Sequence, residues 1–173
     1  ILLLLPVICF GSTASFNPSK DNLLDKAYPD DNNGTLTYIA VRSRYPTYTI
    51  RSILEFDISD IPAGSTINNA TFSLYYYNKA DGDANGRTFN ACKLTRTDWV
   101  ELQSTWNIYK TGSSWTTAGG DFTTSSPSCA DAVIPANYGW VNWDATDLVA
   151  DALASGKAEF LLKDSDETYD GYV

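Results

Sequence analysis

The sequence predicts an all-β protein, an antiparallel β-sandwich with one short helix. Strand-like runs rich in Thr, Tyr, Val, Ile and Phe recur along the 173 residues, and clusters of Gly, Pro, Asn and Asp separate them. Short strands divided by such turns are typical of a sandwich. One segment breaks this pattern with hydrophobic residues at helical spacing. A chain of this length can bury a core of its own, so one domain is expected.

The predicted strands are the segments 36–41, 47–58, 70–77, 87–95, 130–134, 138–143 and 159–163, with a long loop rich in Gly, Ser and Thr from 109 to 128. In the segment 70–77, one set of side chains is expected to face the core and the other to face solvent or a second layer. One set is Phe72, Leu74 and Tyr76, and the other set is Thr71, Ser73, Tyr75 and Tyr77.

Residues 144–156 form the segment with helical spacing. Its apolar positions are Ala145, Leu148, Val149, Ala152 and Leu153. Asp144 or Thr146 is suited to cap the start of a helix, and Gly156 is suited to end it. We expect a short amphipathic helix that closes one end of the sandwich.

The charge balance excludes several classes of partner and chemistry. Twelve Lys and Arg residues stand against 21 Asp and Glu residues, for a formal net charge of −9. Such a chain repels nucleic acid and anionic lipid on average. The sequence contains no His, which rules out Ser-His and Cys-His nucleophile pairs and imidazole metal ligands.

Residues 1–14 are predicted to be part of a signal peptide. The apolar run that ends at Phe10 is too short for a membrane span, and small residues follow it, with Ser12 and Ala14 placed for cleavage after Ala14. The alternative is a buried first strand. The first interpretation predicts a single domain at 15–173 in a secreted or cell-surface protein, with no membrane insertion of the mature domain.

Cys92 and Cys129 are the two cysteines of the predicted mature domain. An even pair in an exported chain suggests one disulfide. Two free buried thiols are the alternative.

Three stretches of the chain share their order and spacing with a known family. They are Arg51-Ser52-Ile53-Leu54-Glu55-Phe56-Asp57 with its continuation to Tyr76, Thr97-Asp98-Trp99 with Ser104-Thr105-Trp106, and Gly139-Trp140-Val141-Asn142-Trp143-Asp144. Over roughly residues 28–173 the chain resembles the DNRLRE domain, also called disaggregatase-related. This resemblance implies a jelly-roll-like sandwich.

The resemblance also implies a setting and a ligand class. Such domains occur in secreted bacterial and archaeal proteins beside polysaccharide lyases or as surface repeats, and some relatives bind uronate polymers such as alginate. Relatives usually continue with another strand after Lys163-Asp164, so a C-terminal truncation at Val173 is expected.

Two groups of side chains are the first candidates for ligand contact. Tyr75 and Tyr77 point the same way and would form a stacking platform for sugar rings if their face is exposed; otherwise they lie between layers or under a loop. Arg42, Arg44 and Arg51 could converge on the carboxylates of a uronate chain, or pair with neighbours such as Glu55.

The tryptophans and one acidic turn add further candidates. Trp115, in the Gly/Ser-rich loop, is expected to be the most exposed tryptophan, while the other four are expected to anchor loops on the core. Asp81, Asp83 and Asn85 match the opening of an EF-hand calcium loop, but its twelfth position is Cys92. A structural calcium or a plain hairpin turn are the two interpretations, and no cofactor is required.

These observations predict a non-catalytic carbohydrate-binding module whose partner is a polysaccharide. A structural or adhesion repeat, in which the same faces pack against neighbouring domains of a larger surface protein, is the first alternative. A polysaccharide-degrading enzyme domain is the second, although no tyrosine or carboxylate pair stands out as catalytic.

Overall fold

The structure is a computed structural model that describes residues 11–44, 46–79, 82–124 and 129–168. Its elements in chain order are β1 Lys20–Asp25, β2 Ile50–Asp57, β3 Thr71–Tyr76, β4 Thr88–Lys93, β5 Ile108–Lys110, β6 Ser113–Ser114, β7 Cys129–Val133, β8 Gly139–Asp144, α1 Thr146–Ala152 and β9 Lys157–Asp164. The predicted all-β sandwich with one short helix is confirmed. No helix among the described residues has the length and apolar character needed to cross a membrane.

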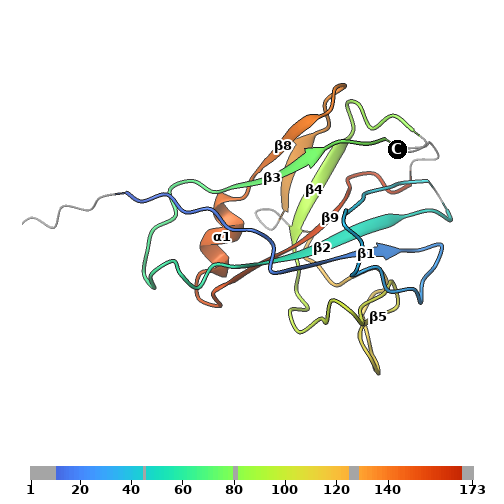
Figure 1. Ribbon diagram of the computed structural model, residues 1–173, viewed down its shortest axis with the longest axis horizontal. Helices are drawn as coiled ribbons and strands as arrows, with labels where there is room; N and C mark the ends of the chain where they lie inside the picture. The colour runs from blue at the N-terminus through green and yellow to red at the C-terminus, as the bar shows by residue number, and fades with distance from the viewer. Residues whose placement is uncertain (1–10, 45, 80–81, 125–128, 169–173) are drawn as a thin grey trace, which may run out of the picture.

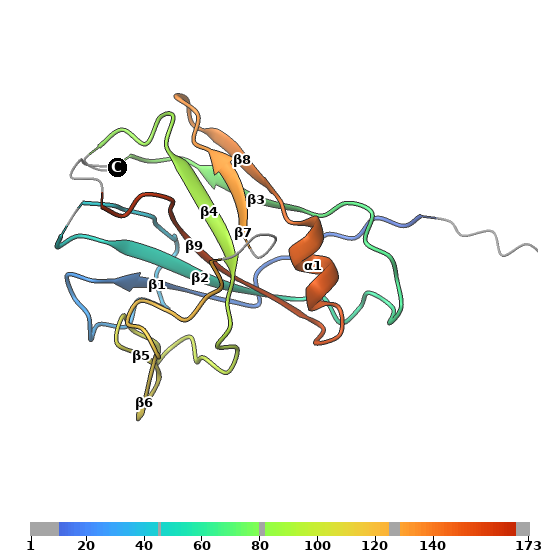
Figure 2. The same ribbon diagram turned by 180° about the vertical axis from the view of Figure 1, so that it is seen from behind.

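Two antiparallel sheets form the sandwich. The larger sheet has the strand order β1-β2-β9-β4-β7, and the smaller one pairs β3 with β8. A hairpin of β5 and β6 lies on the other side of the larger sheet from β3 and β8 (Figures 1 and 2). The larger sheet is therefore covered on both faces.

The first core lies between the two sheets. Phe72 on β3 stacks on Phe160 of β9 and contacts the ring of Trp143 on β8, each with ring centres 5.2 Å apart. The Trp143 Nε1–H donates to the Phe89 carbonyl oxygen of β4 at 2.8 Å. From α1, Leu148 packs into the same cluster. Alternation along β3 is as predicted, since Phe72 is buried and Thr71, Ser73 and Tyr75 are exposed.

The second core covers the opposite face of the larger sheet. Leu24, Ile53 and Leu161 of the three strands β1, β2 and β9 are fully buried there. Three tryptophans from the chain between β4 and β7 pack on them, namely Trp99, Trp106 and Trp115. Strands β2 and β9 carry apolar side chains on both faces. Because apolar side chains are unfavourable in water, each face of the sheet needs a covering layer.

The helix lies within the predicted segment, but neither Asp144 nor Thr146 caps it, because Ala145 is the N-cap residue and no side chain bonds there as a cap. The Thr146 amide donates to Asp144 Oδ1 at 3.1 Å just before the first turn. Gly156 follows the helix with a φ of +70°, a conformation that favours glycine.

Three predictions of local structure were wrong. The segment 36–41 is not a strand, because its Ala40 amide and carbonyl bond to the Ser52 hydroxyl at 3.1 and 2.8 Å instead of to a neighbouring strand. Strand β1 was not predicted. The expected loop 109–128 contains β6 and part of β5.

Candidate functional site

Four exposed aromatic side chains gather on β3 and β8 and at their ends. The exposed fractions are 53% for Tyr75, 56% for Tyr77, 52% for Tyr138 and 65% for Trp140. We call this surface the aromatic face. At Tyr75 and Trp140 it is the outer surface of the smaller sheet, which packs its other side on the first core, whereas Tyr138 contacts Tyr76 at the strand end.

The register of β3 and β8 places two of these rings opposite each other. Tyr75 pairs with Trp140, and the next pair along the two strands is Leu74 with Val141. Because side chains alternate across a strand, Val141 points into the core and Trp140 points to solvent. The Tyr75 and Trp140 rings meet edge to face, with centres 5.4 Å apart and planes at 83°.

A second ring contact lies at the end of β3 and the start of β8. Tyr138 meets the ring of half-buried Tyr76 edge to face, at 5.1 Å and 81°. Burial raises the pKa of Tyr76, so its hydroxyl stays protonated and able to donate a hydrogen bond. The contact therefore holds Tyr138 at the strand end without removing it from solvent.

Polar side chains continue the face along both strands. Ser73 Oγ donates to Asn142 Oδ1 at 2.7 Å, and Thr71 lies opposite Asp144 in the register. From Trp140 to Asp144 the strand advances by four residue steps, or about 13 Å at the rise of a strand. This surface joins aromatic rings to hydroxyl and amide groups in one row.

This combination has a specific chemical use. Aromatic rings attract the C–H groups on the apolar faces of sugar rings, and neighbouring hydroxyl and amide groups can bond the sugar hydroxyls. Aromatic side chains have only two rotatable side-chain bonds, so they lose little conformational entropy when a ligand binds to them. The aromatic face is thus suited to an extended chain of sugar units.

Arg51, the third member of the predicted arginine group, lies inside the fold. Its guanidinium binds both carboxylate oxygens of Glu167 at 2.7 Å, donates to the Gly119 carbonyl oxygen at 2.8 Å and lies over the Trp106 ring. The alternative partner considered for the arginine group, Glu55, bonds instead to two lysines. Arg51 therefore ties the C-terminal segment to the second core.

Arg42 and Arg44 lie in the chain that leads into β2. The Arg42 amide donates to the Ile50 carbonyl oxygen at 3.1 Å, and the Arg44 amide donates to the Tyr48 carbonyl oxygen at 3.1 Å. The Arg44 guanidinium also lies 5.4 Å from the centre of the Tyr48 ring. Neither arginine belongs to the strands of the aromatic face.

The expectation for the tryptophans was wrong for two of them. Trp115 is only 5% exposed, because its loop folds onto the larger sheet and its Nε1–H donates to the Thr105 carbonyl oxygen at 2.9 Å. Trp140, expected to be an anchor, is the exposed one. Strand alternation was the missed signal: in Gly139-Trp140-Val141-Asn142-Trp143, Val141 and Trp143 face inward and leave Trp140 outside.

Asp83 and Asn85 of the predicted calcium turn lie within the described residues. Asp83 Oδ1 accepts the Asn85 amide at 3.2 Å and lies 3.6 Å from Lys79 Nζ, while Asp81 is outside the described residues. Within the described ranges, no three acidic, His or Cys side chains form a group that could hold a metal. Calcium stays a prediction.

The two cysteines are joined. Cys92 and Cys129 form a disulfide between paired positions of β4 and β7. The first ten residues of the predicted signal peptide lie outside the described residues, so that prediction is untested.

Comparison with known families gives one match. The sequence model of carbohydrate-binding module family 96 matches residues 12–172, which is nearly the whole chain. No curated protein matches the chain. The DNRLRE assignment stays a prediction.

Proposed function

Because the chain belongs to carbohydrate-binding module family 96, we propose that it binds a polysaccharide chain on the aromatic face and is not itself catalytic. The observation that carries this proposal is Trp140, 65% exposed and set edge to face against Tyr75. A large aromatic ring left in water against a second exposed ring is unusual on a monomer surface and marks a contact site.

A uronate polymer such as alginate is the finer proposal for the ligand, for a protein that acts outside the cell or at its surface. The support is the family resemblance, the signal-peptide-like run at 1–14, and the two arginines Arg42 and Arg44 in the chain that leads into β2. Arginine binds carboxylates through two parallel hydrogen bonds, which suits a chain that carries one carboxylate on each sugar.

The test is affinity electrophoresis of the protein through gels that contain alginate, pectin, chondroitin or neutral glucans, with and without calcium. At least one polymer should retard the protein. Trp140→Ala should then lower the affinity about tenfold, as expected for the loss of one stacking contact. Tyr28→Ala is the matched control, because Tyr28 is 62% exposed but lies on the loop after β1.

Each outcome bears on the proposal. Equal loss of affinity in the two variants would show that the ligand does not use the aromatic face. Free migration in every gel would favour the alternative of a structural surface domain, whose aromatic face packs against a neighbouring domain. Arg42→Ala and Arg44→Ala should weaken binding of alginate and leave any neutral glucan unaffected.

A further inference from the structure

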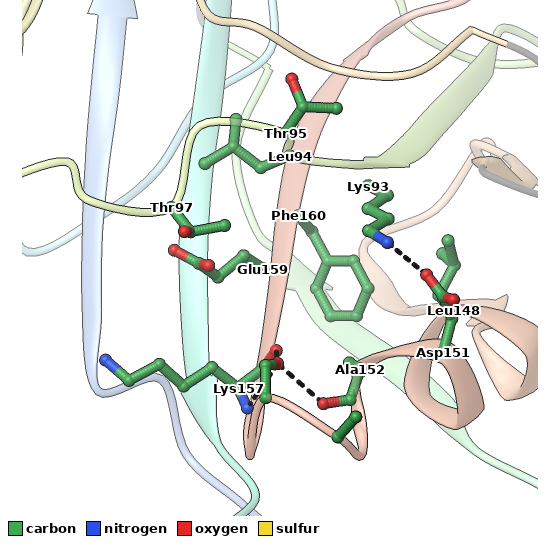
Figure 3. A pocket seen from close by; sticks show the side chains of 12 residues that line it. Lys93, Leu94, Thr95, Thr97, Leu148, Asp151, Ala152, Lys157, Glu159 and Phe160 are labelled. Carbon is green, nitrogen blue, oxygen red and sulfur yellow. Dashed lines mark hydrogen bonds and ion pairs between the residues drawn. The ribbon is translucent and has the colours of Figure 1, made fainter.

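A concave site lies where β4 separates from β9. Lys93, the last residue of β4, still pairs with Phe160, and the Leu94 amide still donates to the Glu159 carbonyl oxygen at 3.0 Å. Beyond this point the chain turns away, and its Thr95 amide bonds to the Asp121 carbonyl oxygen. Helix α1 and the turn after it close the other side, which leaves a pocket of about 490 Å³ (Figure 3).

This pocket is separate from the aromatic face. Its lining comes from the end of β4, the chain at 95–97, α1 with its following turn, and the start of β9. None of these lining residues belongs to β3 or β8. Its volume is within the range of small-molecule sites in proteins.

Donors and acceptors surround the pocket in pairs. Lys93 and Asp151 form an ion pair from β4 to α1 at one side, and both remain partly exposed. Thr95 and Thr97 line the pocket from the loop after β4. An ammonium group beside a carboxylate offers a donor next to an acceptor, which matches two neighbouring hydroxyls on one ligand.

The carboxyl of Glu159 is a buried polar group at the pocket. Glu159 is 6% exposed, and its Oε1 accepts the Trp99 Nε1–H at 2.9 Å. Burial, with a contribution from Glu55, raises the pKa of Glu159 to about 7, so the group is largely uncharged below neutral pH. Lys157 turns its ammonium to Glu55 at 3.0 Å.

The pocket therefore has little net charge and an apolar floor. In Figure 3 the Phe160 ring lies on the side of β9 that carries the Lys93–Asp151 pair, and the Glu159 carboxyl points to the other side of the strand. Leu148 and Ala152 of α1 complete the apolar part of the lining. A ligand with several hydroxyls and some C–H surface matches this mixture of ion pair and apolar lining, and a sugar ring has both.

We propose that this pocket is a second carbohydrate site, which binds one or two neutral sugar units independently of the aromatic face. The ligand class follows the proposed function, but the site and its residues do not depend on it. A chain end or a side branch of a polysaccharide would supply such units.

Titration with glucose, galactose, mannose, xylose and their disaccharides tests this inference by amide and indole NMR. The Trp99 indole N–H is the reporter, because it bonds to Glu159 at the pocket. At least one sugar should shift the Trp99 signal together with those of Thr95 and Thr97. Asp151→Ala should weaken this binding about tenfold, as expected for the loss of a hydrogen bond to a charged group.

Two controls separate this site from the aromatic face. Asp147→Ala changes another exposed carboxylate of α1 that does not line the pocket, and it should leave the affinity for the sugar unchanged. Trp140→Ala should weaken polymer binding and keep the small-sugar shifts. Absence of shifts with every sugar, or shifts that Asp151→Ala leaves unchanged, would overturn the inference even if the aromatic face binds a polymer.

Discussion

Glu55 and Glu159 face each other across β2 and β9, and both are buried. Glu55 carries the negative charge of the pair. Burial opposes that charge, but hydrogen bonds from Lys20 and Lys157 outweigh it and lower the Glu55 pKa. Glu159 has the Trp99 indole and the neighbouring Glu55 as partners, and burial raises its pKa to about 7. The pair thus holds one proton at mildly acidic pH.

Because folded Glu159 holds this proton more tightly than unfolded Glu159 does, we predict that the free energy of unfolding falls as the pH rises. An unfolded Glu gives up its proton near pH 4.5, whereas folded Glu159 keeps it to about pH 7. The unfolded state therefore binds fewer protons in this interval, and the free energy of unfolding falls by up to about 3 kcal/mol between the two pKa values. Urea denaturation from about pH 5 to about pH 8 should show the fall.

The matched variants for this prediction are Glu159→Gln and Asp60→Asn. A Gln at 159 accepts the Trp99 indole and donates to Glu55 at every pH, so its stability should change little over the interval. Asp60 is exposed in a turn, so Asp60→Asn should keep the slope of the unchanged protein. A parallel fall in the Glu159→Gln protein would assign the pH dependence to other groups.

At the scale of an element, the chain between β4 and β7 is a second core layer. Its three buried tryptophans cover Leu24, Ile53 and Leu161. Trp115 packs against Tyr109 and bonds to the Thr105 carbonyl oxygen, so the loop binds both to the sheet and to itself. A loop with such contacts should be as resistant to local unfolding as a strand.

Two tryptophan variants test the role of this layer. Trp115→Ala should lower the free energy of unfolding by about 3–5 kcal/mol, because it empties a buried site. Trp140→Ala removes an exposed ring and should cost less than about 1 kcal/mol. Chemical denaturation measures both, with Trp115→Phe as a milder variant of intermediate stability. Equal costs at the two positions would contradict the assignment of one tryptophan to the core and the other to the surface.

At the scale of the whole molecule, the net charge of −9 affects how a charged polymer approaches. A uronate chain has the same sign, so long-range repulsion opposes binding at low salt, where the screening length is about 30 Å. At physiological salt that length falls to about 8 Å, and short Arg–carboxylate contacts are screened less than the repulsion.

Salt should therefore affect the two classes of polymer differently. Retardation in alginate gels should increase when the salt rises from about 0.01 M to about 0.15 M. Retardation by a neutral glucan should stay constant over the same range, because no net charge of the polymer is involved. Alginate binding that is strongest at the lowest salt would show instead that a local cationic surface dominates the interaction.

Local sequence pattern predicted those parts of the fold that depend on near neighbours. The alternation of Phe72 with Tyr75, the helix beside Leu148 and the turn at Gly156 all follow from the periods of strands and helices and from the freedom of glycine. The alternation left open whether the side of Tyr75 faces solvent, and the structure shows that it does.

Long-range contacts decided what the pattern could not predict. The segment 36–41 has strand composition, yet its Ala40 backbone bonds to the Ser52 side chain. An arginine at position 51 is chemically suited to bind a carboxylate ligand, yet the Glu167 carboxylate of the same chain already binds it. Both structures depend on a partner residue that is distant in sequence. The spacing of apolar and polar residues within one segment does not reveal such a partner.

The sequence by itself determined the class of the protein: an all-β sandwich with one helix, an acidic surface, no histidine chemistry and a polysaccharide as the expected partner. Only the tertiary structure decided which tryptophan meets solvent. Trp115 and Trp140 are chemically identical, but the loop of one closes over Leu161 and its neighbours, while nothing in the described chain covers the outer side of β8. Burial depends on the three-dimensional packing of distant segments, so residue type alone does not set it.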